Sequence, residues 1–249
     1  IQEHDNGITN FHFEIAADLL DEEEMDLLAK MRPGLVQLEI GVQTTNVRTL
    51  VAIRRKTDLE EIQRITARIN RGRNVHQHLD LIAGLPHEDL DSFRRSFNDV
   101  YAMEPEQLQL GFLKVLKGSF MEEMAGSYGL AYSSLPPYEV LSTRWLSYDG
   151  ILELKEVEDM VEVYYNSRQF TCTLKAFENE FASPYSMFYF MGEYYRRRGL
   201  AGISHNRIAR YEILFDIIRN ASRHAADRRR QPVRRARPGM GWKHTGTFS

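Results

Sequence analysis

Polar side chains alternate with apolar ones along four short stretches of the sequence, and three of these side chains could bind one ligand. The stretches are 11–15, 35–42, 75–83 and 108–115. Because successive side chains of a strand point to opposite faces, each stretch predicts a β-strand with one polar face. On that face, Glu14, Gln43 and Asp80 stand near the ends of the first three stretches. Carboxylates accept hydrogen bonds from vicinal hydroxyls, and an amide donates to and accepts from a polar edge of a ligand. This is the chemistry that a nucleoside ligand needs.

Helical patterns follow three of the strands and indicate the class of the sheet. They cover 21–30, 57–72 and 88–101. Strands that alternate with helices predict a mainly parallel α/β sheet, whose outer face the helices cover. The polar face then points into a (βα) barrel, and the carboxyl ends of its strands form the mouth where barrel enzymes do their chemistry. The alternative is an antiparallel sheet with one wet face, which explains each strand alone but not the helices between them.

Three histidines share the polar face and raise the question of a metal site. His12, His76 and His78 have the inward parity, and Glu14 could complete a set of ligands. Histidines inside a fold are more often satisfied by neighbouring polar groups, so we expect no metal at these residues.

The pattern changes after residue 118, where we expect a second, helical part. Helices are predicted over 121–128, 138–146, 152–166, 186–199 and 206–221. We place the barrel part at 1–118, a helical domain at 135–224 and a basic, disordered tail at 225–249, with the Pro136–Pro137 loop as the joint. The aromatic stripe between Tyr185 and Tyr195 is typical of helix packing.

The composition is that of a globular protein. The 249 residues carry a net charge of −3, and 43% of them are hydrophobic. No apolar run is long enough to cross a bilayer, and the first residues do not form a signal peptide. The single cysteine, Cys172, excludes an internal disulfide and a multi-cysteine metal site, and it fits a reducing cytoplasm. Since there is no initiator Met, we expect the sequence to start inside a longer polypeptide.

Five strings, in this order and spacing, resemble the later strands of radical S-adenosylmethionine enzymes. They are FHFEIAADLL, LEIGVQTTN, IRRKTDLEEI, HLDLIAGLPHE and LKVLKGS. The resemblance is to the branch with an N-terminal cobalamin-binding domain, and the helical part resembles an uncharacterised C-terminal domain of such proteins. It implies the later units of a partial TIM barrel, with a CxxxCxxC loop for a 4Fe–4S cluster upstream of this sequence. The cofactors it implies are S-adenosylmethionine, the cluster and, in the upstream domain, cobalamin.

The resemblance also implies roles for the three polar residues at the strand ends. Glu14 matches an acid that contacts S-adenosylmethionine, and Asp80 matches an acid near the ribose. Gln43 matches a polar residue near the ribose or the carboxylate. A structural bond from Asp80 to a loop amide is the competing interpretation of that residue.

Three further positions receive roles from the same resemblance. Arg55 matches an arginine that pairs with the methionine carboxylate, which suits its planar fork. Its neighbour Arg54 is the alternative, and a solvated helix end would explain both. Val115 and Leu116 match the backbone and apolar surface that meet adenine.

The implied function is part of an enzyme that cleaves S-adenosylmethionine reductively and acts on a small-molecule substrate. The partner is the upstream portion of the same polypeptide, and without the cluster loop we expect this sequence alone to be inactive. A second hypothesis is a non-catalytic scaffold that holds a partner through its aromatic helices. Binding of nucleic acid by the arginines of residues 223–237 is disfavoured, because the rest of the chain has no comparable basic patch. We expect no membrane association.

Overall fold

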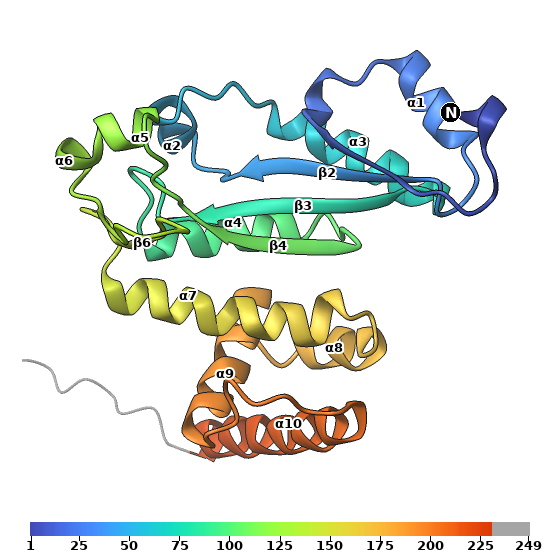
Figure 1. Ribbon diagram of the computed structural model, residues 1–249. Coiled ribbons are helices and arrows are strands. Elements are labelled where there is room, and N and C mark those ends of the chain that lie inside the picture. The colour runs from blue at the N-terminus through green and yellow to red at the C-terminus, as the bar shows by residue number, and fades with distance from the viewer. Residues whose placement is uncertain (231–249) are drawn as a thin grey trace, which may run out of the picture. The chain divides into compact units, whose positions relative to one another are not determined.

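The computed structural model describes residues 1–230, and its centre is a four-stranded sheet in which all neighbouring strands run parallel. The strands are β1 (Phe11–Ile15), β2 (Val36–Gln43), β3 (His76–Ala83) and β4 (Gln107–Phe112). They lie side by side in the order β1-β2-β3-β4 (Figure 1). The four predicted strands and the α/β class are confirmed. Among the described residues the sheet stays open and does not close into a barrel.

The three predicted helices of the barrel part are confirmed, and each begins at an aspartate. They are α1 (Glu22–Ala29), α3 (Leu59–Gly72) and α4 (Leu90–Tyr101). The carboxylates of Asp21, Asp58 and Asp89 each accept a hydrogen bond from a backbone N–H in the first turn, which satisfies one of the free donors there. Three short helices were not predicted: η1 (Gln2–His4), η2 (Ala17–Leu19) and α2 (Val47–Ala52).

Helices α3 and α4 lie along one face of the sheet (Figure 1), and the apolar side chains of that face form the core. Strand side chains such as Ile40, Leu79 and Leu108 are at most 1% exposed, and so are Ile65 and Phe93 on the covering helices. Burial of each such side chain contributes roughly 1.5–3 kcal/mol to the free energy of folding. Because these residues alternate with the polar ones, the same register turns the polar residues to the opposite face.

The segment after β4 is helical over 121–128 as predicted, in two short helices, and departs from the prediction beyond them. It contains α5 (Phe120–Glu123), α6 (Ala125–Tyr128), β5 (Ala131–Tyr132) and β6 (Val140–Ser142). The helix predicted over 138–146 is wrong, since β6 pairs antiparallel with β5. The N–H of Val140 also donates to the Leu113 carbonyl (2.8 Å), and that of Val115 donates to the Tyr138 carbonyl (2.9 Å). Extended pairing with the end of β4 thus outweighs the helical spacing of apolar residues.

The remaining helices of this part pack through large aromatic residues. They are α7 (Tyr148–Met160), the π-helical segment η3 (Val161–Asn166), α8 (Thr171–Glu178) and α9 (Pro184–Arg197). Tyr185 and Phe188 of α9 are buried against Phe97 of α4, with ring centroids 5.5 and 5.9 Å apart. The predicted packing role of these residues of the aromatic stripe is therefore confirmed. Helix α8 was not predicted.

The chain forms two compact units, residues 1–203 and a second unit from Ser204 onward. The described part of the second unit contains helix α10 (Arg207–Arg230). The predicted domain limits at 118, 135 and 224 stay predictions, and of the predicted tail the residues 231–249 lie outside those that the structure describes. No helix within residues 1–230 has the length and apolar character to span a bilayer.

Candidate functional site

The polar face of the sheet holds a pocket of about 260 Å³ at the carboxyl ends of β1, β2 and β3. Strand register sets Glu14 opposite Glu39 and Gly41 opposite Asp80. The lining residues are Glu14, Ile15, Ala16, Glu39, Gly41, Gln43, Arg55 and Asp80. The structure therefore brings four of the six predicted site residues together: Glu14, Gln43, Arg55 and Asp80.

Asp80 has the most perturbed titration in this pocket. Burial raises the pKa of its carboxyl to about 7, and the nearby charge of Glu39, a hydrogen bond with Glu39 and the charge of Glu14 act in the same direction. Its Oδ1 atom is buried and has no hydrogen-bond partner among the described residues. Asp80 thus brings a buried, unsatisfied carboxyl oxygen to the wall of the pocket, and near neutral pH its carboxyl can hold a proton.

The backbone between Gly41 and Gln43 is irregular, and this irregularity shapes one wall of the pocket. The register to β3 shifts here, and Gln43 has a left-handed φ of 69°. Its amide folds back over Gly41, so that a Cβ at position 41 would overlap the Gln43 Nε2. The Arg55 Nη2 donates to the Gly41 carbonyl at 2.6 Å. Gly41 is therefore needed for close approach of both side chains.

The two neighbouring arginines lie in different surroundings. The guanidinium of Arg55 lines the pocket, whereas that of Arg54 lies over the ring of Phe120, 3.8 Å from its centroid. Arg54 itself has a left-handed φ of 59°, which turns the chain between the two residues. Of the two candidates for a carboxylate partner, only Arg55 lines this pocket.

Val115 and Leu116 do not line the pocket. Val115 is 1% exposed and its N–H is bound to the Tyr138 carbonyl, while Leu116 is 51% exposed. Both follow β4, the strand farthest from β1 in the sheet. Their predicted contact with adenine stays a prediction.

Two of the three histidines of the polar face, His12 and His78, are paired with polar neighbours nearer the amino ends of the strands. The His12 Nε2 lies 2.9 Å from a Glu39 carboxylate oxygen, and the His78 Nε2 lies 3.2 Å from the Gln37 amide nitrogen. Burial and the neighbouring His76 lower the pKa of His78. Within residues 1–230 no group of three or more His, Cys, Asp or Glu side chains is arranged to hold a metal ion.

Glu39 and Glu88 belong to the region and were not predicted as site residues. Glu39 has the inward parity of its strand. The sequence does not show that it lies opposite Glu14 in the sheet, and this pairing is what places it in the pocket. Glu88 is 1% exposed and bound to hydroxyls of Thr44 and Ser96, which lie 44 and 8 residues away in sequence. No periodicity of the sequence indicates such a contact.

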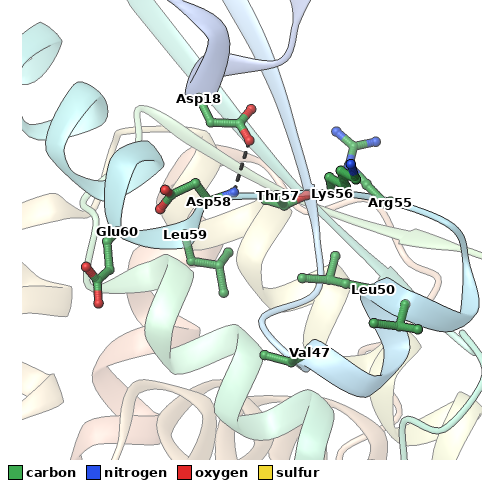
Figure 2. Close-up of a pocket in the computed structure, with 10 residues that line it drawn as sticks. Asp18, Val47, Leu50, Arg55, Lys56, Thr57, Asp58, Leu59 and Glu60 are labelled. Carbon is green, nitrogen blue, oxygen red and sulfur yellow. Dashed lines mark hydrogen bonds between the residues drawn. The ribbon is translucent and has the colours of Figure 1, made fainter.

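A larger, open cleft of about 760 Å³ adjoins Arg55 between η2, α2 and α3. Its apolar lining includes Val47, Leu50 and Leu59, and Figure 2 shows the Arg55 guanidinium directed away from Val47 and Leu50. The Asp18 carboxylate accepts a hydrogen bond from the Asp58 N–H (3.0 Å) and joins η2 to the start of α3. Arg55 is thus shared between this cleft and the polar pocket.

Two sequence comparisons cover different parts of the chain. Residues 126–231 match a family whose description is "Protein of unknown function (DUF4080)". The oxygen-independent coproporphyrinogen III oxidase of Pseudomonas aeruginosa is 31% identical over 121 residues. That match covers 48% of this chain and 25% of the relative, so the chain spans about a quarter of the curated relative that it matches.

Solved structures give partial likenesses. Coproporphyrinogen III oxidase from Escherichia coli, a radical SAM enzyme, has 20% identity and a TM-score of 0.46, over 60% of this chain and 32% of that one. The radical S-adenosylmethionine methyltransferase TsrM from Kitasatospora setae, solved with tryptophan and a SAM analog, has 19% identity and a TM-score of 0.41. The likeness covers 51% of this chain and 26% of the TsrM chain. The fold class rests on the parallel sheet of this chain itself.

Proposed function

We propose that the polar pocket binds S-adenosylmethionine and that the chain forms part of a radical S-adenosylmethionine enzyme. The observation that carries this proposal is the convergence of Glu14, Gln43, Arg55 and Asp80 at the carboxyl ends of parallel strands. The five sequence strings support it, and so does the identity of 31% with a coproporphyrinogen III oxidase over part of the chain.

The chemistry of the pocket fits groups of S-adenosylmethionine. The buried Oδ1 of Asp80, which has no partner in the described part of the chain, suits a ribose hydroxyl as donor. Arg55 suits the methionine carboxylate, and the acid Glu39 suits the cationic part of the ligand. At about 260 Å³ the pocket lies just below the roughly 300–1,000 Å³ of ligand pockets, so we assign to it one part of the ligand.

A 4Fe–4S cluster does not fit the residues of this sequence. Such clusters are held by several cysteine thiolates, whereas this sequence has one cysteine, Cys172, exposed on α8. We therefore assign no cluster ligand to this chain and derive no step of S-adenosylmethionine cleavage from it. Use of cobalamin stays a prediction.

The role that we assign to the chain is to bind and orient the ligand. Asp80 and Glu14 hold the ribose from two strands, Gln43 reads a polar edge beside them, and Arg55 fixes the carboxylate end. Because Arg55 is anchored on the Gly41 carbonyl at 2.6 Å, its guanidinium needs little rearrangement to meet a carboxylate.

Titration calorimetry with two ligands tests this assignment. S-adenosylmethionine should bind the chain, and Arg55→Gln should raise its dissociation constant about tenfold by removing a charge-assisted hydrogen bond. The same substitution should leave 5′-methylthioadenosine unaffected, since that ligand lacks the amino-acid carboxylate. Arg54→Gln is the matched control and should change neither constant, because Arg54 lies on Phe120. Equal effects of both substitutions, or no binding by the unaltered chain, would contradict the proposal.

A further inference from the structure

Glu88 is a buried carboxyl at the turn between β3 and α4, next to the pocket but outside its lining. It is 1% exposed, and no arginine, lysine or histidine forms an ion pair with it among the described residues. Burial raises the pKa of Glu88 to about 7, although hydrogen bonds from Thr44 and Ser96 act against this rise. Because burial of a carboxyl without an ion-pair partner costs folding free energy, the position of Glu88 needs a structural or functional reason.

The partners of Glu88 are two hydroxyls that in turn hold backbone. The Thr44 Oγ1 donates to the Glu88 Oε1 at 2.6 Å, and the Ser96 Oγ donates to the same oxygen at 3.0 Å. The Thr44 hydroxyl accepts from the N–H of Asn46 at 3.0 Å, and the Ser96 hydroxyl accepts from the N–H of Thr45 at 3.1 Å. One carboxyl oxygen therefore organises the backbone donors of the segment 44–46 through two hydroxyls.

A second set of bonds fastens the same segment to the β3–α4 turn. The Asn46 amide donates to the His87 carbonyl (3.1 Å) and to the Ser92 hydroxyl (2.8 Å). Its oxygen accepts from the Arg48 N–H at 3.0 Å and caps α2. The segment 44–46 is thus fixed at two points of one region, at Glu88 and at the first turn of α4.

This segment lies between two residues of the pocket. Gln43 precedes it directly in a left-handed conformation, and α2 leads from it to Arg55, whose N–H donates to the Leu50 carbonyl at 2.9 Å. A shift of the segment would move the Gln43 amide and the start of α2 together. The side chains of Gln43 and Arg55 both lie against Gly41, where an added Cβ would overlap the Gln43 Nε2 and lie 3.4 Å from the Arg55 Nη2.

We infer that Glu88 is a positioning residue for the polar pocket, which holds the segment 44–46 through Thr44 and Ser96 and thereby sets the places of Gln43 and Arg55. This inference rests on the proposed binding of S-adenosylmethionine for its functional consequence. The placement of the segment itself does not depend on any ligand.

Three variants of the full chain test the inference. Glu88→Gln keeps an oxygen for both hydroxyls, whereas Glu88→Ala removes it. Gln77→Ala is the matched control, because Gln77 is a fully buried polar residue of β3 whose amide binds the Thr66 carbonyl (3.2 Å) and Asn70 (2.8 Å), away from the segment. Both alanine variants should lower the melting temperature. A difference between them in the other measurements therefore does not come from lost stability alone.

The readouts are hydrogen exchange of the amides of Thr45 and Asn46 and the dissociation constant for S-adenosylmethionine. In Glu88→Ala these amides should exchange faster and the constant should rise about tenfold, as expected for losing a positioning hydrogen bond. Glu88→Gln should restore both readouts, and Gln77→Ala should leave both near those of the unaltered chain. Equal exchange in all variants, or an affinity loss in Gln77→Ala as large as in Glu88→Ala, would overturn the inference.

The two proposals fail in different ways. If the unaltered chain does not bind S-adenosylmethionine, the proposed function is wrong, and hydrogen exchange alone then decides whether Glu88 places the segment. If the unaltered chain binds the ligand but Glu88→Ala binds it equally well, the proposed function stands and the role of Glu88 is wrong.

Discussion

Asp80 shows how a single residue acquires its properties from three strands. Its neighbours Glu14 and Glu39 come from β1 and β2, and together they place three carboxyls around one small pocket. Burial is the largest cause of the raised pKa of Asp80, and the nearby charges of Glu39 and Glu14 add to it. The register of the sheet brings these groups together, and the raised pKa makes the stability of the protein depend on pH.

The sign of that dependence follows from the pKa of Asp80, which is about 7 in the folded chain against 3.8 as its ordinary value. Between these values the folded chain holds a proton that the unfolded chain has released, so stability is lost as the pH rises through this window. In the Asp80→Asn variant the side chain at position 80 does not titrate. The free energy of unfolding of this variant minus that of the unaltered chain should therefore increase by about 1–2 kcal/mol from pH 5 to pH 8, allowing for partial exposure of Asp80. Urea unfolding at both pH values measures this difference, and an unchanged difference would contradict the assignment.

At the scale of elements, α7 and α9 meet at a glycine. A Cβ on Gly192 of α9 would lie 3.1 Å from the Glu156 Cβ and 3.2 Å from the Glu156 carbonyl oxygen on α7. The two backbones therefore approach closely, and no larger side chain fits between them without displacement.

Gly192→Ala should accordingly destabilise the chain by about 1–2 kcal/mol, because backbone of α7 must move to accept the methyl group. Gly126→Ala in α6 is the control, since nothing lies within 4 Å of its added Cβ, and it should be neutral or stabilising by about 0.5 kcal/mol. Thermal unfolding of both variants gives the comparison. Equal melting temperatures would show that α7 and α9 are not in close contact at this point.

The elements also show what sequence reasoning reaches. Alternation of polar and apolar residues predicts β1 to β4, and the parity of Glu14, Gln43 and Asp80 predicts that they share one pocket, because both follow from local geometry. The short helix α2 was missed although Asn46 is a good N-cap, since six residues leave little helical period. The β5–β6 pair and the contacts of Glu88 depend on partners distant in sequence, which periodicity does not identify.

At the scale of the whole chain, binding and electron supply are separate requirements. The residues proposed to bind S-adenosylmethionine line one pocket of the first unit, whereas the only thiol in the sequence that could bind a cluster is that of Cys172. Under the proposed function, this chain binds S-adenosylmethionine and does not cleave it by itself.

Treatment of the chain with iron and sulfide under reducing conditions tests this separation. We expect no stoichiometric 4Fe–4S cluster and no 5′-deoxyadenosine from added S-adenosylmethionine, because one thiolate does not hold such a cluster. Absorption spectroscopy, iron analysis and product chromatography measure the outcome. A full cluster together with 5′-deoxyadenosine would show that the chain is an active enzyme.

A crystal structure of the chain with S-adenosylmethionine tests the central claim most directly. We expect the ribose hydroxyls beside Asp80 and Glu14 and the methionine carboxylate on Arg55, in the pocket at the ends of β1, β2 and β3. The ligand in the open cleft beside Val47 and Leu50, or a pocket that stays empty at a saturating concentration, would contradict it.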